Sequence, residues 1–242
     1  MKVDQVKLFG QTLSETWDYV IVSTIPQVFN RLAWLFNRPV SGLNAWYPNF
    51  YIKNRNSTFL FIKTYPGSGN CIDPIEFLLM CGTKISNMIF IGFGGALKKE
   101  ISVGTQAFID RVDISDAISN TILPNKKIIP IKLQEPILEL LKINSFDIPR
   151  KTMTCSSFAC LAFEDKKSLY NKALQSIDIV DLETGPLYAW CNTRGIWMNS
   201  VLVVSDHPYH SMPIWAQNTD NQFVTLSLYY LLDNFYEILI SI

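Results

Sequence analysis

The sequence is poor in residues that bind metals or form disulfides. It contains two histidines and five cysteines, and no CxxC pair occurs. An odd number of cysteines without that spacing favours reduced, mostly buried thiols over zinc sites or disulfides. The histidines, His207 and His210, are close together, but no third ligand is evident. We therefore expect neither a metal ion nor another cofactor.

The sequence also lacks an excess of charge of either sign. Its 21 basic and 21 acidic residues give a formal net charge of zero, so no attraction to nucleic acid or to an anionic membrane is expected. Residues 1–5 lack a hydrophobic signal-peptide run, and no apolar stretch reaches the roughly 18 to 20 residues of a membrane span. We expect a cytoplasmic protein whose partners are small molecules or copies of itself.

No linker, repeat or low-complexity tract divides the chain, which indicates one domain over residues 1–242. Within it, apolar runs typical of strands alternate with segments of helical spacing. This alternation predicts an α/β protein with three α/β/α layers around a central, twisted sheet that is mixed but mostly parallel. The expected strands lie near 19–23, 50–53, 58–65, 87–92, 104–112, 152–156, 177–182 and 198–205, and the expected helices near 28–36, 73–81, 134–143, 186–194 and 217–240.

Two of the expected strands stop at a carboxylate. Glu183 follows residues 177–182, and Asp206 follows residues 198–205. An acid at the carboxyl end of a parallel strand faces the crevice in which α/β proteins hold their ligands. We therefore expect both side chains to meet one small molecule.

Four short motifs follow one another along the chain. They are G-F-G-G-A-L at 92–97, I-S-V-G at 101–104, V-D-L-E at 180–183 and V-V-S-D at 203–206. In order and spacing they resemble the landmarks of the purine nucleoside phosphorylase and uridine phosphorylase superfamily, which includes nucleosidases for methylthioadenosine, S-adenosylhomocysteine and AMP. The resemblance extends from residue 19 to the last helix. It implies cleavage of the N-glycosidic bond of a purine nucleoside or nucleotide.

The resemblance gives the two carboxylates different roles. Cleavage builds positive charge on the sugar and negative charge on the departing base, so it requires a donor at the base and an anchor on the ribose. Asp206 would donate to N7 of the purine, for which a dry pocket must raise its pKa. Glu183 would bind the 2'- and 3'-hydroxyls of the ribose, and Leu182 would pack on the sugar. The alternative is that Glu183 caps the following helix and Asp206 caps a turn.

Two glycine-rich segments are implied to contact the substrate. Ser68 and Gly69, with Gly67, occupy the family's glycine turn, where backbone amides approach the sugar or the nucleophile; a plain loop is the alternative. Gly94 lies in the G-F-G-G run. Because this run lacks both the GxGxxG spacing and the lysine of a P-loop, dinucleotide binding is not expected.

Aromatic and imidazole side chains complete the implied site. The family has a base-stacking phenylalanine upstream of its ribose glutamate, and Phe158 and Phe163 bracket that position. We expect one of them, with Phe158 favoured, to cover the purine and the other to pack in the core. His207 follows Asp206 with a spacing that resembles the AMP nucleosidase branch. A surface histidine without function is the alternative.

The residues that hold phosphate in the phosphorolytic members are different here. The corresponding positions hold Thr24, Val28, Phe90 and Phe93, none of which carries the positive charge that a dianion requires. Water is therefore the favoured acceptor. Phosphate held by other residues, such as Lys63 or Arg111, is the alternative.

The glutamate that activates water in hydrolytic relatives is also absent. Its place is held by Gln27 or Pro26, neither of which can act as a general base. The candidates to replace it are Asp73, Glu76 and Asp113, each of which could equally be a solvated cap.

The sequence leaves three hypotheses about the function open. The first is a purine nucleosidase, the second a phosphorylase with a rebuilt anion site, and the third a non-catalytic relative that keeps the nucleoside pocket. Aromatic clusters at 46–51 and 229–236 suit either the core or a subunit interface. Because family members form oligomers, we expect a homo-oligomer.

Overall fold

Buried side chains alternate between the two faces of each central strand. In β1 (Thr16–Ser23), Val20 and Val22 belong to one apolar cluster and Ile21 to another. The strands β4 (Lys84–Ala96) and β9 (Trp197–Asp206) alternate between the same two clusters. Because successive side chains of a strand point to opposite faces, the sheet must be covered on both sides.

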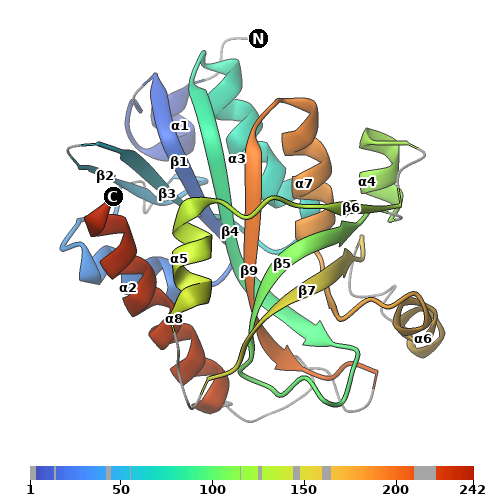
Figure 1. Ribbon diagram of the computed structural model, residues 1–242. Helices are drawn as coiled ribbons and strands as arrows, with labels where there is room; N and C mark the ends of the chain where they lie inside the picture. The colour runs from blue at the N-terminus through green and yellow to red at the C-terminus, as the bar shows by residue number, and fades with distance from the viewer. Residues whose placement is uncertain are drawn as a thin grey trace.

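Helices supply that cover in the computed structural model (Figure 1). One face carries α2 (Pro26–Leu35), α5 (Glu135–Lys142) and α8 (Gln222–Ser241), and the other carries α3 (Ser68–Met80) and α7 (Thr184–Thr193). The three α/β/α layers of the prediction are therefore confirmed. The structure describes residues 4–13, 15–41, 45–54, 56–114, 116–124, 127–143, 148–159, 165–209 and 222–242.

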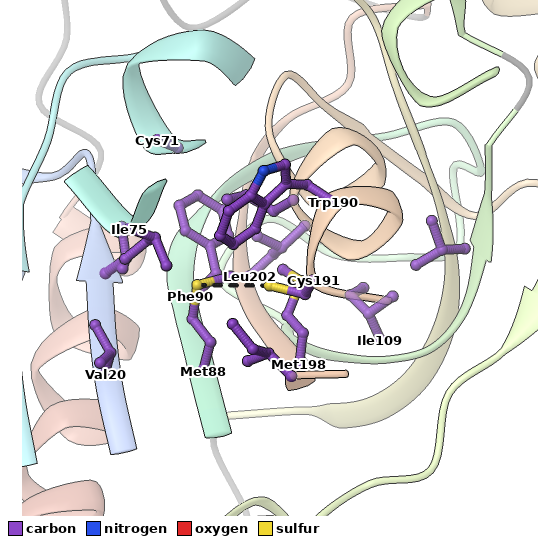
Figure 2. Packing of buried hydrophobic residues seen from close by; sticks show 14 of the residues in the cluster. Val20, Cys71, Ile75, Met88, Phe90, Ile109, Trp190, Cys191, Met198 and Leu202 are labelled. Atoms are coloured by element: carbon purple, nitrogen blue, oxygen red, sulfur yellow. Dashed lines mark hydrogen bonds between the residues drawn. The ribbon is translucent and has the colours of Figure 1, made fainter. Parts of the chain in front are cut away.

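The core between the sheet and α3 and α7 is tightly packed (Figure 2). Ile75 of α3 and Trp190 of α7 lie over Met88, Phe90 and Leu202 of the strands. The thiol of Cys191 approaches the sulfur of Met88 to 3.9 Å. Cys71, Cys155 and Cys191 are buried and Cys81 is partly buried, and all four are free thiols, as predicted; Cys160 lies outside the described residues.

Five strands close into a ring. β4 pairs with β8 (Ile179–Asp181), β8 with β7 (Arg150–Ser157), β7 with β5 (Gln106–Asp113), β5 with β9, and β9 with β4 again. From β4 the sheet continues through β1 and β3 (Thr58–Lys63) to β2 (Asn49–Lys53), and from β5 to β6 (Ile128–Pro130). Five of the nine described pairings are parallel and four antiparallel, which agrees with a mixed, mostly parallel sheet.

Several boundaries differ from the prediction. β4 continues beyond Gly92 to Ala96, because the G-F-G-G segment pairs with both β9 and β8. α3 begins at Ser68 rather than near Asp73, so Pro74 lies inside the helix and costs it one hydrogen bond. Four short elements were not predicted: α1 (Gln5–Phe9), α4 (Ala117–Ile122), β6 and α6 (Lys166–Leu174).

By length and composition, α8 is apolar enough to cross a membrane. In this structure it instead packs against α2, α5 and β9, with Leu228, Leu231 and Phe235 buried in the core. The expectation that no apolar stretch reaches the length of a membrane span was therefore wrong for α8. Because a core helix of a water-soluble protein passes the same test, the expectation that the protein avoids membranes stays a prediction. The expected start of this helix near residue 217 lies outside the described residues.

Candidate functional site

Glu183 lies between the end of β8 and the start of α7. Its side chain is only 5% exposed. Oε1 accepts a hydrogen bond of 2.8 Å from the backbone N–H of Gly67, and Oε2 accepts one of 3.3 Å from the N–H of Leu182. The carboxylate thus reaches from β8 to the turn that follows β3.

The helix-capping alternative for Glu183 is excluded by these contacts. Glu183 occupies the N-cap position of α7, yet its side chain forms no capping hydrogen bond. The N–H of Thr184 instead donates to Asp181 Oδ2 at 2.9 Å. Glu183 therefore keeps its carboxylate for a contact outside its own helix.

The glycine turn lies directly against Glu183. Gly67 has a φ of +103°, a conformation that favours glycine, and it precedes the first residue of the 13-residue helix α3. Ser68 and Gly69 form the first turn of α3, and a Cβ atom built at Gly69 would meet nothing within 4 Å. The structure thus brings the predicted turn and Glu183 together, with open space beside Gly69.

A buried thiol lies next to this contact. Cys71, one helical turn into α3, is 3.3 Å from the hydroxyl of Thr64. Burial raises the pKa of the Cys71 thiol well above its usual range, and the neighbouring Glu183 carboxylate raises it further. Cys71 therefore stays protonated at neutral pH and is not a nucleophile.

Asp206 ends β9 on the opposite side of β4. Its side chain is 6% exposed, and Oδ1 accepts a hydrogen bond of 2.6 Å from the Ser205 hydroxyl. Gly95 pairs with Asp206 on one side and with Val180 on the other. Two strand spacings of about 4.8 Å put the backbone of Asp206 roughly 10 Å from that of Val180, three residues before Glu183.

The strands that carry the two acids run in opposite directions. β9 is parallel to β4, whereas β8 is antiparallel to it. The expectation that both acids end strands of the same direction was therefore wrong. The ring of strands, rather than a common carboxyl edge, sets the positions of Glu183 and Asp206 on either side of the end of β4.

Glycines at the end of β4 make room for this arrangement. A Cβ atom at Gly95 would lie 2.6 Å from the ring of Pro208 and 3.4 Å from Asp206 Oδ1. A Cβ atom at Gly94 would lie 2.7 Å from Ile179 of β8. Gly94 thus has a packing reason to be glycine, and its predicted contact with substrate stays a prediction.

His207 is half-buried and bonded to the protein. Its Nε2 lies 2.7 Å from the carbonyl oxygen of Ile101, in the loop after β4. This contact fixes the loop that follows Asp206. The proposed contact of His207 with substrate stays a prediction, and His210 lies outside the described residues.

Phe158 borders a cavity of about 460 Å³ between the end of β7, α4 and α6. Among the described residues, this cavity is lined by neither Glu183 nor Asp206. Phe158 also packs on Leu97 and Val180, with Leu182 partly buried beside them. Its predicted stacking on a base is therefore not supported by this cavity, and Phe163 lies outside the described residues.

The candidates for a water-activating base are mostly engaged elsewhere. Asp113 is buried, accepts a hydrogen bond of 2.7 Å from Ser156 and forms an ion pair with Lys172. Glu76 pairs with Arg194 at 3.1 Å. Asp73 lies on α3 with much of its surface exposed. The part of its carboxyl group that is shielded from water raises the pKa of Asp73 above its usual value.

Three of the four positions that would hold phosphate pack in the core, whereas Thr24 is partly exposed. Val28 of α2 and Phe90 of β4 are buried in clusters on opposite faces of the sheet, and Phe93 packs against the same cluster as Val28. Lys63 lies on β3 and Arg111 on β5, with β1, β4 and β9 between these strands, so an anion site would use one of the two cations without the other. Over the described ranges, no group of three or more histidine, cysteine, aspartate or glutamate side chains is arranged to hold a metal ion.

No family model and no curated protein matches the sequence. Solved structures, in contrast, resemble this one closely. Uridine phosphorylase from Vibrio fischeri superposes with a TM-score of 0.74 at 20% sequence identity, covering 93% of this chain and 91% of that chain.

Two nucleosidases have similar structures. A variant of the Helicobacter pylori 5'-methylthioadenosine/S-adenosylhomocysteine nucleosidase, with 5'-methylthioadenosine in its active site, has a TM-score of 0.72 at 12% identity and covers 93% of this chain and 99% of that chain. AMP nucleosidase from Bacteroides thetaiotaomicron has a TM-score of 0.70 at 19% identity, with 98% and 94% covered. The chain therefore has the fold of nucleoside phosphorylases and nucleosidases. The fold that the sequence motifs implied is confirmed.

Proposed function

We propose that this protein cleaves the N-glycosidic bond of a purine nucleoside or nucleotide and uses water as the acceptor. The observation that carries the proposal is the Glu183 carboxylate, which is buried, forms no capping hydrogen bond with α7 and accepts a hydrogen bond from the amide of Gly67. A carboxylate held in this way is preorganised to accept hydrogen bonds from the two hydroxyls of a ribose. The proteins that share the fold, which act on nucleosides by their names, support the same class of substrate.

In the proposed reaction, Glu183 anchors the ribose and Asp206 acts at the base. Asp206 donates a proton to N7 as the bond to the sugar breaks, so the base leaves as a neutral molecule. Water then adds to the cationic sugar and releases a proton to solvent or to a nearby base. The packing of Leu182 on the sugar and the contacts from Ser68, Gly69, Gly94 and His207 belong to the same proposal.

Water is favoured because none of the four places of the phosphate-binding residues holds a cation and three of them are apolar. Val28 and Phe90 are buried in the core, where a charged side chain would be costly. A phosphorylase with a different anion site and a non-catalytic nucleoside-binding protein are the other candidates. Assembly into a homo-oligomer in the cytoplasm completes the proposal.

The test is an assay for base release from adenosine, inosine, methylthioadenosine, AMP and uridine, each with and without phosphate. We expect release of a purine at a rate that phosphate does not change. Release only in the presence of phosphate would establish the phosphorylase instead. Binding of a nucleoside without any release would establish the non-catalytic candidate, and release of uracil alone would overturn the choice of a purine.

A further inference from the structure

The backbone N–H groups at the start of α7 donate hydrogen bonds to residues other than the side chain of its own N-cap residue, Glu183. A helix N-terminus leaves backbone N–H groups that need acceptors. Besides Thr184, which donates to Asp181, the N–H of Gly185 donates to Ser157 Oγ at 2.7 Å. Pro186 has no N–H, and Leu187 donates to the carbonyl of Glu183. No donor of the first turn is left for the Glu183 side chain.

Asp181 is the centre of this arrangement. Its buried carboxylate accepts hydrogen bonds from the N–H and the hydroxyl of Thr184, from the hydroxyl of Ser157 and from the thiol of Cys155. Ser157 thus links Asp181 of β8 to Gly185 of α7. The network joins β7, β8 and α7 through one carboxylate.

Close packing fixes the helix start from the other side. A Cβ atom at Gly185 would lie 3.1 to 3.2 Å from side-chain oxygens of Ser119, Asp116 and Ser157. Glycine at this position therefore lets the start of α7 lie close to α4 and β7. The backbone that carries Glu183 is held between this contact and Asp181.

We propose that Asp181 is a positioning residue that keeps the Glu183 carboxylate available for the ribose; this inference rests on the proposed function. An acidic side chain at an N-cap is normally attracted to the N–H groups of the first turn. Asp181 and Ser157 occupy those groups, so Glu183 turns to Gly67 instead. Without Asp181, the Glu183 side chain turns back to cap α7 and leaves the sugar site.

A double-mutant cycle tests this coupling. Asp181→Ala, Glu183→Gln and the double variant are compared for KM and kcat on the nucleoside whose base the protein releases. We expect Asp181→Ala alone to raise KM about tenfold, a coupling within the range measured for side chains of one network. In the Glu183→Gln background the same change has no further effect on KM. Asp181→Asn keeps an acceptor for Thr184 N and retains KM within a few-fold.

The controls separate positioning from general damage. Thr121→Ala removes an exposed hydroxyl of α4 that donates to the carbonyl of Ala117, and it leaves KM unchanged. If Asp181→Ala does not fold, Ser157→Ala takes its place in the cycle. It removes the acceptor of the Gly185 N–H, and we expect it to show the same coupling to Glu183. An equal loss from Asp181→Ala in both backgrounds overturns the positioning role. Normal KM and kcat in Glu183→Gln alone would instead refute the proposed function itself.

Discussion

In the proposed reaction, Asp206 is the residue whose chemistry a nucleoside-binding protein of the same fold would not require. Its carboxylate is buried at the end of β9 and accepts a hydrogen bond from Ser205. An asparagine has nearly the same shape and still accepts that bond, but it has no acidic proton to donate to a leaving base. Substitution at this one position therefore separates chemistry from binding.

We expect Asp206→Asn to lower kcat by about 100- to 10,000-fold, the usual contribution of a general acid, while the dissociation constant of the nucleoside changes little. Steady-state kinetics and equilibrium titration with the nucleoside measure the two effects. Asp233→Asn makes the same chemical change on the surface of α8, where Asp233 pairs with Arg31, and is expected to affect neither. Full activity in Asp206→Asn would remove this residue from the mechanism.

Asp181 gives a second prediction at the scale of one residue, on stability. Burial raises the pKa of Asp181 in the folded protein, although its hydrogen bonds oppose the shift. The native state then holds this proton to a higher pH than the unfolded chain, where the pKa is about 3.9. The free energy of unfolding therefore falls as the pH rises from about 4 through the folded-state pKa.

Asp181→Asn cannot titrate, so it is expected to remove this part of the pH dependence. Urea unfolding at a series of pH values from 4 upward measures the free energy of unfolding of both proteins. The variant should gain stability relative to the wild type as the pH rises. Parallel curves would mean that the carboxyl group has an ordinary pKa in the folded state.

Glu183 and Asp206 could be proposed from the sequence, because each follows an expected strand. It did not indicate the role of Asp181, although this residue is two positions from Glu183. That role depends on Ser157, which lies on another strand and meets Asp181 only through the pairing of β7 with β8. Contacts of this kind have no local pattern in a sequence.

At the scale of elements, the glycines of β4 determine how closely its neighbours approach. The prediction ended this strand at Gly92, and glycine inside a strand often marks a bulge or a close approach of another part of the chain. Here the glycines mark a close approach, since Gly94 and Gly95 lie against Ile179 and Pro208. The direction of β8 could not be predicted from the sequence, because a three-residue strand carries no signal of its orientation.

Gly95→Ala is expected to destabilise the protein by about 1 to 3 kcal/mol, because the new methyl group would overlap the ring of Pro208. It should also lower activity, since Asp206 lies beside the same position. Gly69→Ala is the matched control for stability. Its methyl group meets nothing within 4 Å, and alanine is favoured over glycine in a helix, so the free energy of unfolding should stay equal or rise by up to about 1 kcal/mol. Equal stability of Gly95→Ala and the wild type would show that the loop after β9 is free to move away.

For the whole molecule, one sheet separates two apolar cores. Met88 and Ile89 are neighbours on β4, both fully buried, and they belong to opposite cores. Loss of a buried side chain from one core therefore also weakens the packing of a strand that belongs to the other core. The prediction of a single domain implies that both cores unfold together.

Met88→Ala and Ile89→Ala are each expected to lower the free energy of unfolding by about 2 to 5 kcal/mol. Denaturant unfolding followed by both tryptophan fluorescence and circular dichroism should show one shared transition in each variant. Leu174→Ala, on the exposed side of α6, serves as the control and should stay within about 0.5 kcal/mol of the wild type. Two separate transitions would instead indicate that the layers are independent domains.

The ring of strands also limits how copies of this chain can associate. Among the described strands, only β2 and β6 lack a neighbour on one side. β6 has three residues and ends in Pro130, which has no N–H to donate, and β2 has five residues and ends in Lys53. Short edges of this kind are poor templates for adding a strand from another molecule. Any assembly of this protein is therefore expected to join side-chain surfaces, and its sheet should resist the edge-to-edge growth that leads to fibrils.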